Sequence, residues 1–222
     1  MQTDEIYNFF RSLIDEDDTT FLTEAQANTM LKEAYSEFRD IVNTIEPDVY
    51  STQDFITLQN TNVYDLTTAD PLNGNMYLGA TATNGKRIAR LVRIGTVDSQ
   101  ASNKIQFWLT PVPNVEDLSG DDYARQGNKI VFGYEYNRTF RMEYVPHHTA
   151  TFGPAGGAFL DDLDQFHPLI ALIAAKYYEI RDGAESAALE RRRLEKIKEL
   201  KTWLTRFWKG GIAQRTHRTL EL

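Results

Sequence analysis

The stretch Phe166–Gly183, FHPLIALIAAKYYEIRDG, decides the fold. Between Leu169 and Ile180 the apolar residues fall on most sides of a helix, which is typical of a helix at the centre of a core. Pro168 is tolerated in a first helical turn, and a glycine after Asp182 favours a helix end there. The sequence therefore predicts a central helix that opens at about Asp164 and ends at Asp182-Gly183.

A second helix is expected directly after this one, from about Glu185 to Phe207. Its apolar residues repeat at intervals of three and four, and basic residues lie opposite them. The apolar stripe is Leu194, Ile197, Leu200, Leu204, Phe207 and Trp208. The basic face is Arg191, Arg192, Arg193, Lys196, Lys198 and Lys201. Gly210-Gly211 ends the helix, and the remaining tail shows no clear pattern.

Two further helices are expected at the N-terminus. Residues 2–16 place apolar residues on one face, and residues 24–45 carry a longer apolar stripe. Thr23 and Gln26 match a capping box, in which each side chain bonds the other residue's backbone N–H. Pro47 is expected to end the second helix.

Residues 50–150 differ from the helical segments on both sides. Short runs of β-branched and aromatic residues alternate with turn dipeptides such as Asn73-Gly74, which favours an antiparallel sheet or small sandwich. The expected strands are Asp54–Leu58, Arg87–Val97, Lys104–Leu109, Lys129–Tyr134 and Arg138–Val145.

The predicted fold class is therefore mainly α with a β insertion (α+β). Residues 1–49 and 160–209 are expected to pair as a four-helix bundle, with an antiparallel β-rich domain at 50–150 inserted between the second and third helices. Residues 151–159 form a Gly/Pro-rich loop, and residues 210–222 form a C-terminal tail.

Composition excludes several classes of protein. The 222 residues include no cysteine, so disulfides, thiol catalysis and cysteine-zinc sites are ruled out. The longest apolar run, Pro168–Ala175, is much shorter than the roughly 20 residues that span a bilayer, and the acidic N-terminus is unlike a signal peptide. We therefore expect a soluble protein with no membrane partner.

Charge is unevenly distributed along the chain. Residues 1–50 hold 12 acidic and 3 basic residues, whereas residues 185–222 hold 5 acidic and 10 basic ones. Oppositely charged faces could steer identical subunits into head-to-tail contact. Two unrelated solvated faces would explain the pattern equally well.

Few residues suggest chemistry. The acidic run Asp15–Asp18 lacks the glycine and spaced glutamate of a calcium loop, and a solvated helix end explains it. His147 and His148 would point to opposite faces of a strand and chelate poorly. A local hydrogen bond to a nearby aspartate explains His167 better than catalysis does. We predict no catalytic residue, no metal site and no cofactor. The alternative is an enzyme that uses the acidic run or His147 and His148.

The end of the last helix gives the strongest interaction signal. Trp203, Phe207 and Trp208 either complete the helical core or anchor the helix end and tail on another subunit, since aromatic anchors dominate interfaces. The basic face, at Arg191, Arg192, Lys196 and Lys198, could contact DNA. A solvated face or an acidic protein partner accounts for it as well, since the whole chain is acidic.

Three stretches together resemble the head-to-tail connector (portal adaptor) proteins of tailed phages, in the long subgroup found with podovirus-type tails. The stretches are the N-terminal helix with Phe21-Leu22-Thr23 and Leu31–Phe38, the end of the β region at Phe140–Pro146, and Leu160–Leu204 with Phe166-His167-Pro168-Leu169-Ile170. The likeness spans nearly the whole chain. It is one of layout and spacing, and the large β insertion departs from the shortest family members.

The resemblance implies a structural virion protein without catalytic residues. Such adaptors form a ring, of 12 copies, in the virion neck between the capsid portal and the tail or nozzle protein, after assembly in the host cytoplasm. It implies that the C-terminal tail lies along a portal subunit, and the interface candidates there are Arg215, His217, Arg218 and Leu220. DNA in the channel would be an incidental contact. The alternative is another virion component, such as a tail-tube or head-completion protein, or a cellular scaffold.

Overall fold

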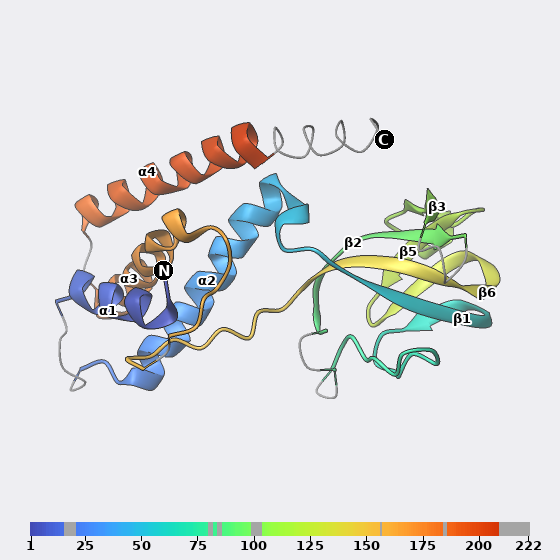
Figure 1. Cartoon of the computed structure of the whole chain (residues 1–222), viewed down its shortest axis with the longest axis horizontal. Coiled ribbons are helices and arrows are strands. Elements are labelled where there is room, and N and C mark those ends of the chain that lie inside the picture. The colour runs from blue at the N-terminus through green and yellow to red at the C-terminus, as the bar shows by residue number, and fades with distance from the viewer. Residues whose placement is uncertain are drawn as a thin grey trace, which may run out of the picture. The chain divides into compact units, whose positions relative to one another are not determined.

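The computed structural model describes residues 1–15, 21–79, 82–83, 86–98, 104–155, 157–183 and 186–208. The chain forms two compact units (Figure 1). The helical unit comprises Met1–Val49 and Thr149–Leu222, and the β unit comprises Tyr50–His148. Each unit is described by itself.

The described part of the helical unit has four α-helices. They are α1 (Thr3–Leu13), α2 (Glu24–Ile45), α3 (Pro168–Asp182) and α4 (Ala187–Trp203). Short turns flank them: η1 (Pro47–Val49), η3 (Asp164–Phe166) and the π-helical turn η4 (Leu204–Trp208). None of the described helices is long and apolar enough to cross a bilayer.

Local sequence explains where these helices begin and end. The predicted capping box is confirmed, because Thr23 Oγ1 accepts a 3.3 Å hydrogen bond from Gln26 N and Gln26 Oε1 accepts one of 3.1 Å from Thr23 N. Pro168 stands in the first turn of α3. Gly183 ends that helix with a φ of 71°, a left-handed conformation that glycine adopts without steric cost.

Helix α3 is the centre of the helical unit. Every residue from Leu169 to Ala175 is buried, and most of the helix–helix packing involves α3 (Figure 1). Helix α4 contributes little to this core, since within its bounds Leu200 alone is buried. Leu204 is buried in the next turn, whereas Leu194 is exposed.

The β unit contains a six-stranded sheet. Its strands are β1 (Thr52–Asp65), β2 (Ile88–Val97), β3 (Ile105–Trp108), β4 (Thr110–Pro111), β5 (Asp122–Gln126) and β6 (Lys129–Pro146). The strand order is β3-β2-β6-β5-β4, and β1 also pairs with β6. All neighbours are antiparallel except β4 and β5.

The two longest strands bend the sheet toward a barrel. Strand β1 has a register irregularity around Asn60, which holds a φ of 51° that asparagine tolerates better than most residues. Strand β6 pairs with β5 near its start and with β2 near its end. Between β3 and β4, Leu109 N donates to Ile94 O of β2 at 2.9 Å, and Thr110 N then donates to Asp121 O at 3.1 Å. The β3–β4 segment therefore links β2 to β5.

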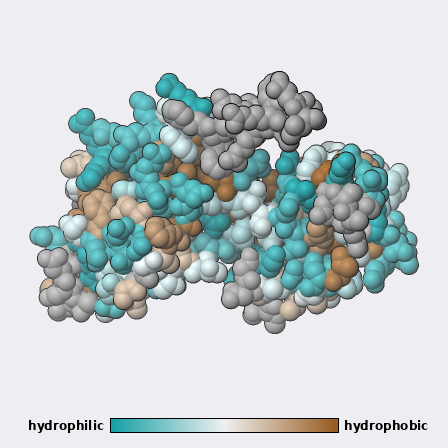
Figure 2. Space-filling view, in the orientation of Figure 1, coloured by the Kyte–Doolittle hydropathy of each residue, from teal (hydrophilic) through white to brown (hydrophobic). Residues whose placement is uncertain are grey.

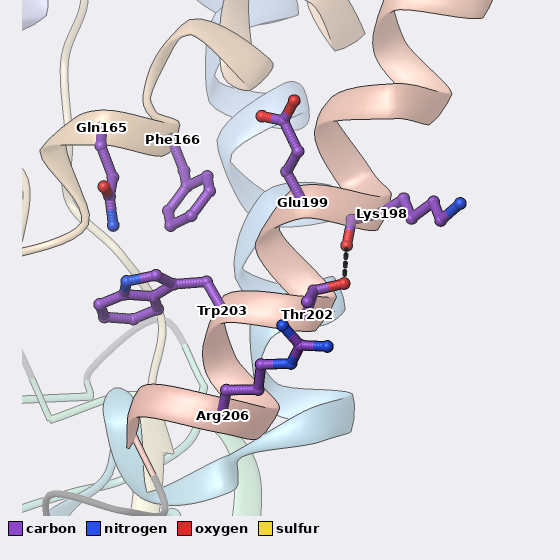
Figure 3. A pocket seen from close by; sticks show the side chains of 7 residues that line it. All are labelled: Gln165, Phe166, Lys198, Glu199, Thr202, Trp203 and Arg206. Atoms are coloured by element: carbon purple, nitrogen blue, oxygen red, sulfur yellow. Dashed lines mark hydrogen bonds between the residues drawn. The ribbon is translucent and has the colours of Figure 1, made fainter.

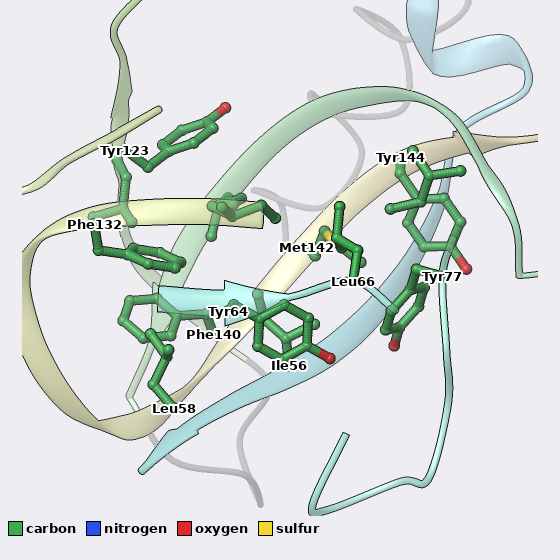
Figure 4. Close-up of a cluster of buried hydrophobic side chains, with 14 residues drawn as sticks. Ile56, Leu58, Tyr64, Leu66, Tyr77, Tyr123, Phe132, Phe140, Met142 and Tyr144 are labelled. Atoms are coloured by element: carbon green, nitrogen blue, oxygen red, sulfur yellow. The ribbon is translucent and has the colours of Figure 1, made fainter. Parts of the chain in front are cut away.

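This curved sheet encloses a core of its own (Figure 4). Phe132 and Phe140 pack with their ring centroids 5.1 Å apart, and Tyr77 meets Tyr144 edge to face at 5.8 Å. The other members are Ile56, Leu58, Tyr64, Leu66, Ile88, Ile94, Leu109, Tyr123, Ile130 and Met142. The β unit therefore has an apolar core independent of α3.

The predicted fold class, a mainly α protein built on a four-helix bundle with an inserted β-rich domain, is wrong. The structure is a mixed α/β fold in which a nearly closed, barrel-like sheet forms a large part of the chain. The helices do not form a bundle of four equivalent members, because packing centres on α3 and α4 buries little of its apolar stripe. Spacing on α4 showed that a stripe exists, but spacing alone does not say whether the stripe is covered.

Candidate interaction surface

An open groove lies in the helical unit between η3 and the C-terminal end of α4 (Figure 3). Its volume is about 420 Å³. Gln165 and Phe166 line it from η3, and Lys198, Glu199, Thr202, Trp203 and Arg206 line it from α4 and η4. We call it the α4 groove.

Two aromatic side chains form the apolar part of the α4 groove. The Phe166 ring is buried and the Trp203 indole is half-buried, with centroids 5.6 Å apart at an interplanar angle of 63°. Figure 3 shows the indole reaching from α4 toward η3. Edge-to-face packing of this kind holds both rings in place and leaves part of the indole open to a ligand.

A buried polar cluster positions η3. The fully buried His167 places Nε2 2.8 Å from Oδ1 of Asp161, which confirms the expected local hydrogen bond. Asp161 also accepts hydrogen bonds from Tyr35 Oη of α2 at 3.0 Å and from Leu163 N at 2.8 Å. Because one carboxylate joins α2 to the turn before α3, Phe166 stands on a fixed backbone.

The rim of the α4 groove is cationic. Lys198 and Arg206 both line the groove, and Lys201 lies on the same end of α4. Within the described residues, none of these three side chains forms an ion pair. Glu199 is the groove's only acidic lining residue in that part of the chain, and Lys196 neutralises it at 2.6 Å. The groove therefore presents uncompensated positive charge beside an apolar surface.

The rest of the basic face is neutralised locally. Its ion pairs are Arg191–Glu195 at 3.0 Å, Arg193–Glu190 at 2.9 Å and Lys196–Glu199 at 2.6 Å. A hydrogen bond from Arg193 holds the pKa of the Glu190 carboxyl below its usual value. Arg192 stacks over the Phe9 ring of α1, 5.6 Å from its centroid. A DNA-binding face needs free cations, so these pairs do not favour the first half of α4 as such a face.

The structure brings together only some of the predicted interface residues. Trp203 and Lys198 line the α4 groove, whereas Arg191, Arg192 and Lys196 lie on α4 outside it. Phe207 and Trp208 belong to the backbone of η4, and their side chains lie outside the described part of the molecule. Arg215, His217, Arg218 and Leu220 also lie outside the described residues.

Five residues of the α4 groove were not predicted from the sequence: Gln165, Phe166, Glu199, Thr202 and Arg206. Arg206 follows Trp203 by three positions, so helical spacing could have placed it on the same face. Glu199 and Thr202 are also three positions apart, so they share one face of the helix. Gln165 and Phe166 gave no comparable signal, because their place opposite α4 depends on the turn between two distant segments.

The other candidate sites remain unsupported as metal centres. Among the described residues, no group of three or more His, Asp or Glu side chains could hold a metal ion. His147 N donates to Arg87 O at 2.7 Å, which fixes the end of β6 beside the start of β2. Most of the acidic run Asp15–Asp18 lies outside the described residues.

Among the described residues that line the α4 groove, no pair of side chains forms a nucleophile–base arrangement. The groove's aromatic floor suits an apolar side chain, and its rim suits a neighbouring carboxylate or phosphate. Comparison with models of known protein families and with curated proteins gives no match for this chain.

Proposed function

We propose that the chain is a structural virion protein that assembles into a ring and connects the portal of a tailed phage to its tail. The observation that carries the proposal is the α4 groove at the C-terminal end of α4, where an aromatic pair lies beside Lys198 and Arg206, which form no ion pair with any described residue. Buried aromatic and arginine side chains at the centre of a contact supply most of the binding energy of protein interfaces.

Charge distribution supports a contact between copies of the chain. Residues 1–50 carry a net charge of −9, and residues 185–222 carry +5. A surface that binds a different surface on the next copy is heterologous, and such contacts close into rings when the rotation between copies allows it. Opposite charges on the two surfaces would also favour the correct orientation during encounter.

Exposed apolar side chains also favour an assembly role. The large ones on the helical unit are Phe21, Phe159, Ile180 and Leu194. Figure 2 shows hydrophobic patches, in brown, among the hydrophilic side chains of the visible face. Among these exposed apolar residues, Phe21 and Phe159 are the most exposed, by 74% and 72%.

The resemblance of three sequence stretches to phage portal adaptors is our reason for proposing this particular class of virion protein. By that resemblance the ring would hold 12 copies in the virion neck, with the helical unit and the C-terminal segment docked on the portal protein. The β unit, which the shortest family members lack, is our own assignment to the tail or nozzle protein. The alternative of another virion component shares the assembly surfaces but not the portal.

The test is particle mass in solution, measured for the protein alone and after mixing with portal rings of the same virus. We expect a discrete complex with many copies per portal. Lys198→Gln with Arg206→Gln should weaken it by removing the groove's positive charge. Arg191→Gln is the matched control, because Arg191 lies on the same helix, is 81% exposed along its side chain and pairs with Glu195.

The proposal would be refuted if the protein stays monomeric and forms no complex with the portal ring. If the Lys198→Gln, Arg206→Gln variant assembles as well as the Arg191→Gln variant does, the chain still forms a ring, but the α4 groove is not part of the contact. Deleting residues 210–222 then tests the tail separately, since its loss should weaken the portal complex without unfolding the helices.

A further inference from the structure

A cluster of charged and aromatic side chains covers part of the outer face of the β unit. Cross-strand register places Glu143 of β6 opposite Arg93 of β2, and places both Arg141 of β6 and Trp108 of β3 opposite Gly95. Their neighbours Ile94 and Met142 point into the core. We call Arg93, Trp108, Arg141 and Glu143 the outer platform.

Two arginines share one carboxylate on the outer platform. Arg93 Nε donates to Glu143 Oε2 at 2.6 Å, and Arg141 Nη2 donates to Glu143 Oε1 at 2.8 Å. Glu143 is buried, whereas the Arg93 side chain is 43% exposed. The three charged groups together carry one net positive charge at the surface.

Packing against Trp108 holds the exposed arginine in place. The Arg93 guanidinium lies 4.1 Å from the centroid of the Trp108 ring. Gly95 makes room for this ring, because a Cβ atom there would come within 2.7 Å of Trp108 Cε3. A guanidinium fixed on two sides has lost most of its rotamer freedom before any ligand arrives, so binding costs less entropy.

Most of the donors on the outer platform remain unused. A guanidinium has five N–H donors, and within the described residues each of these two arginines donates to Glu143 through a single nitrogen. The Nε atom of Arg141 is buried with no hydrogen-bond partner in that part of the chain. An acceptor oxygen of a ligand could therefore form charge-assisted hydrogen bonds with the remaining N–H donors of these two arginines.

We propose that the outer platform binds a carboxylate group of an acidic protein segment. One net positive charge matches one carboxylate, whereas the fixed carboxylate of Glu143 would repel a phosphate of higher charge. Trp108, which is 37% exposed, offers apolar contact for residues beside the acid. The inference goes beyond ring formation and does not depend on the α4 groove.

The test uses the full chain and fluorescence anisotropy of three labelled probes. They are a short peptide that alternates glutamate with valine, the same peptide with glutamine in place of glutamate, and an oligothymidylate of similar length. We expect the glutamate peptide to bind with an affinity that falls as salt rises, and to exceed both other probes. Stronger binding of the oligothymidylate, or equal binding of the glutamine peptide, would overturn the proposal.

Three variants locate the site. Arg93→Gln and Arg141→Gln should each weaken binding of the glutamate peptide by about fivefold, the value of one well-placed ion pair. Arg125→Gln is the matched control, since Arg125 is an exposed arginine of β5 outside the outer platform. Equal loss in Arg125→Gln and Arg93→Gln, or unchanged binding in both Arg93→Gln and Arg141→Gln, would show that the platform is not the site.

Discussion

Tyr177 of α3 donates a 2.6 Å hydrogen bond from its phenol to Oε2 of Glu37 on α2. Arg193 of α4 approaches the other oxygen of the same carboxylate at 3.3 Å. Glu37 therefore links three helices whose contact the apolar pattern alone does not specify. Burial and the hydrogen bond to Glu37 both raise the pKa of Tyr177, so the phenol remains a donor across the physiological range.

Replacing Tyr177 by phenylalanine should destabilise the protein by about 1 kcal/mol, the net value of a typical hydrogen bond in a folded protein. Urea unfolding followed by circular dichroism measures the change. Tyr134→Phe is the control, because Tyr134 is 58% exposed and should change stability by less than about 0.5 kcal/mol. Equal stability of the two variants would mean that the Tyr177–Glu37 bond contributes nothing in solution.

The β unit should lose stability at alkaline pH. Burial raises the pKa of Tyr123 to about 12, and burial together with the hydrogen bond to Asp121 raises that of Tyr136 to about 12. Burial also raises the pKa of Tyr64, Tyr77 and Tyr144. A group whose pKa is higher when folded stabilises the fold fully below its unfolded pKa, which is about 10 for tyrosine, and loses that contribution above it.

We therefore expect the free energy of unfolding to hold steady up to about pH 10 and to fall between about pH 10 and pH 12. Urea titrations at several pH values measure it, with tyrosinate absorbance recorded in parallel. Full ionisation of all tyrosines near pH 10, without unfolding, would contradict the buried environment of these rings.

Gly133 is the position in β6 where a side chain is least tolerable. A Cβ atom there would lie 2.4 Å from the backbone oxygen of Gly120, which cannot rotate away. Gly133→Ala should therefore cost about 1–3 kcal/mol, as overpacking does elsewhere. Gly153→Ala is the control, because nothing lies within 4 Å of a Cβ at that position. Thermal unfolding compares them, and similar midpoints would show that the Ser119–Gly120 turn moves freely.

Local signals predicted the individual elements better than their packing. The capping box at Thr23 and the glycine end of α3 are short-range features, and both appear as expected. Strand β6 was predicted as two strands, Lys129–Tyr134 and Arg138–Val145, separated by three residues. The structure continues through them as one bent strand, since β1 pairs with β6 on both sides of the bend.

The α4 groove likewise shows that local sequence signals predict single elements but not how distant elements pack together. From its position near the end of an amphipathic helix, Trp203 was predicted either to complete the helical core or to anchor an interface, and in the structure it lines the α4 groove. The opposite wall is Phe166, which is distant in sequence and stands on a turn fixed by the Asp161–His167 pair. No periodicity within either segment encodes that meeting, because it depends on how η3 packs against α4.

The last prediction separates the core of α4 from its proposed interface. Leu200 is fully buried, so Leu200→Ala should cost about 2–5 kcal/mol through lost contacts and an unfilled cavity. Trp203 is half-buried at the groove, so Trp203→Ala should cost less than Leu200→Ala despite removing a larger side chain. Urea unfolding measures the stability of each variant, and the particle mass after mixing with portal rings measures its assembly. We expect Trp203→Ala to remain folded while losing most of the complex. If it unfolds as readily as Leu200→Ala, Trp203 is a core residue; if it folds and assembles normally, the α4 groove is not a binding surface.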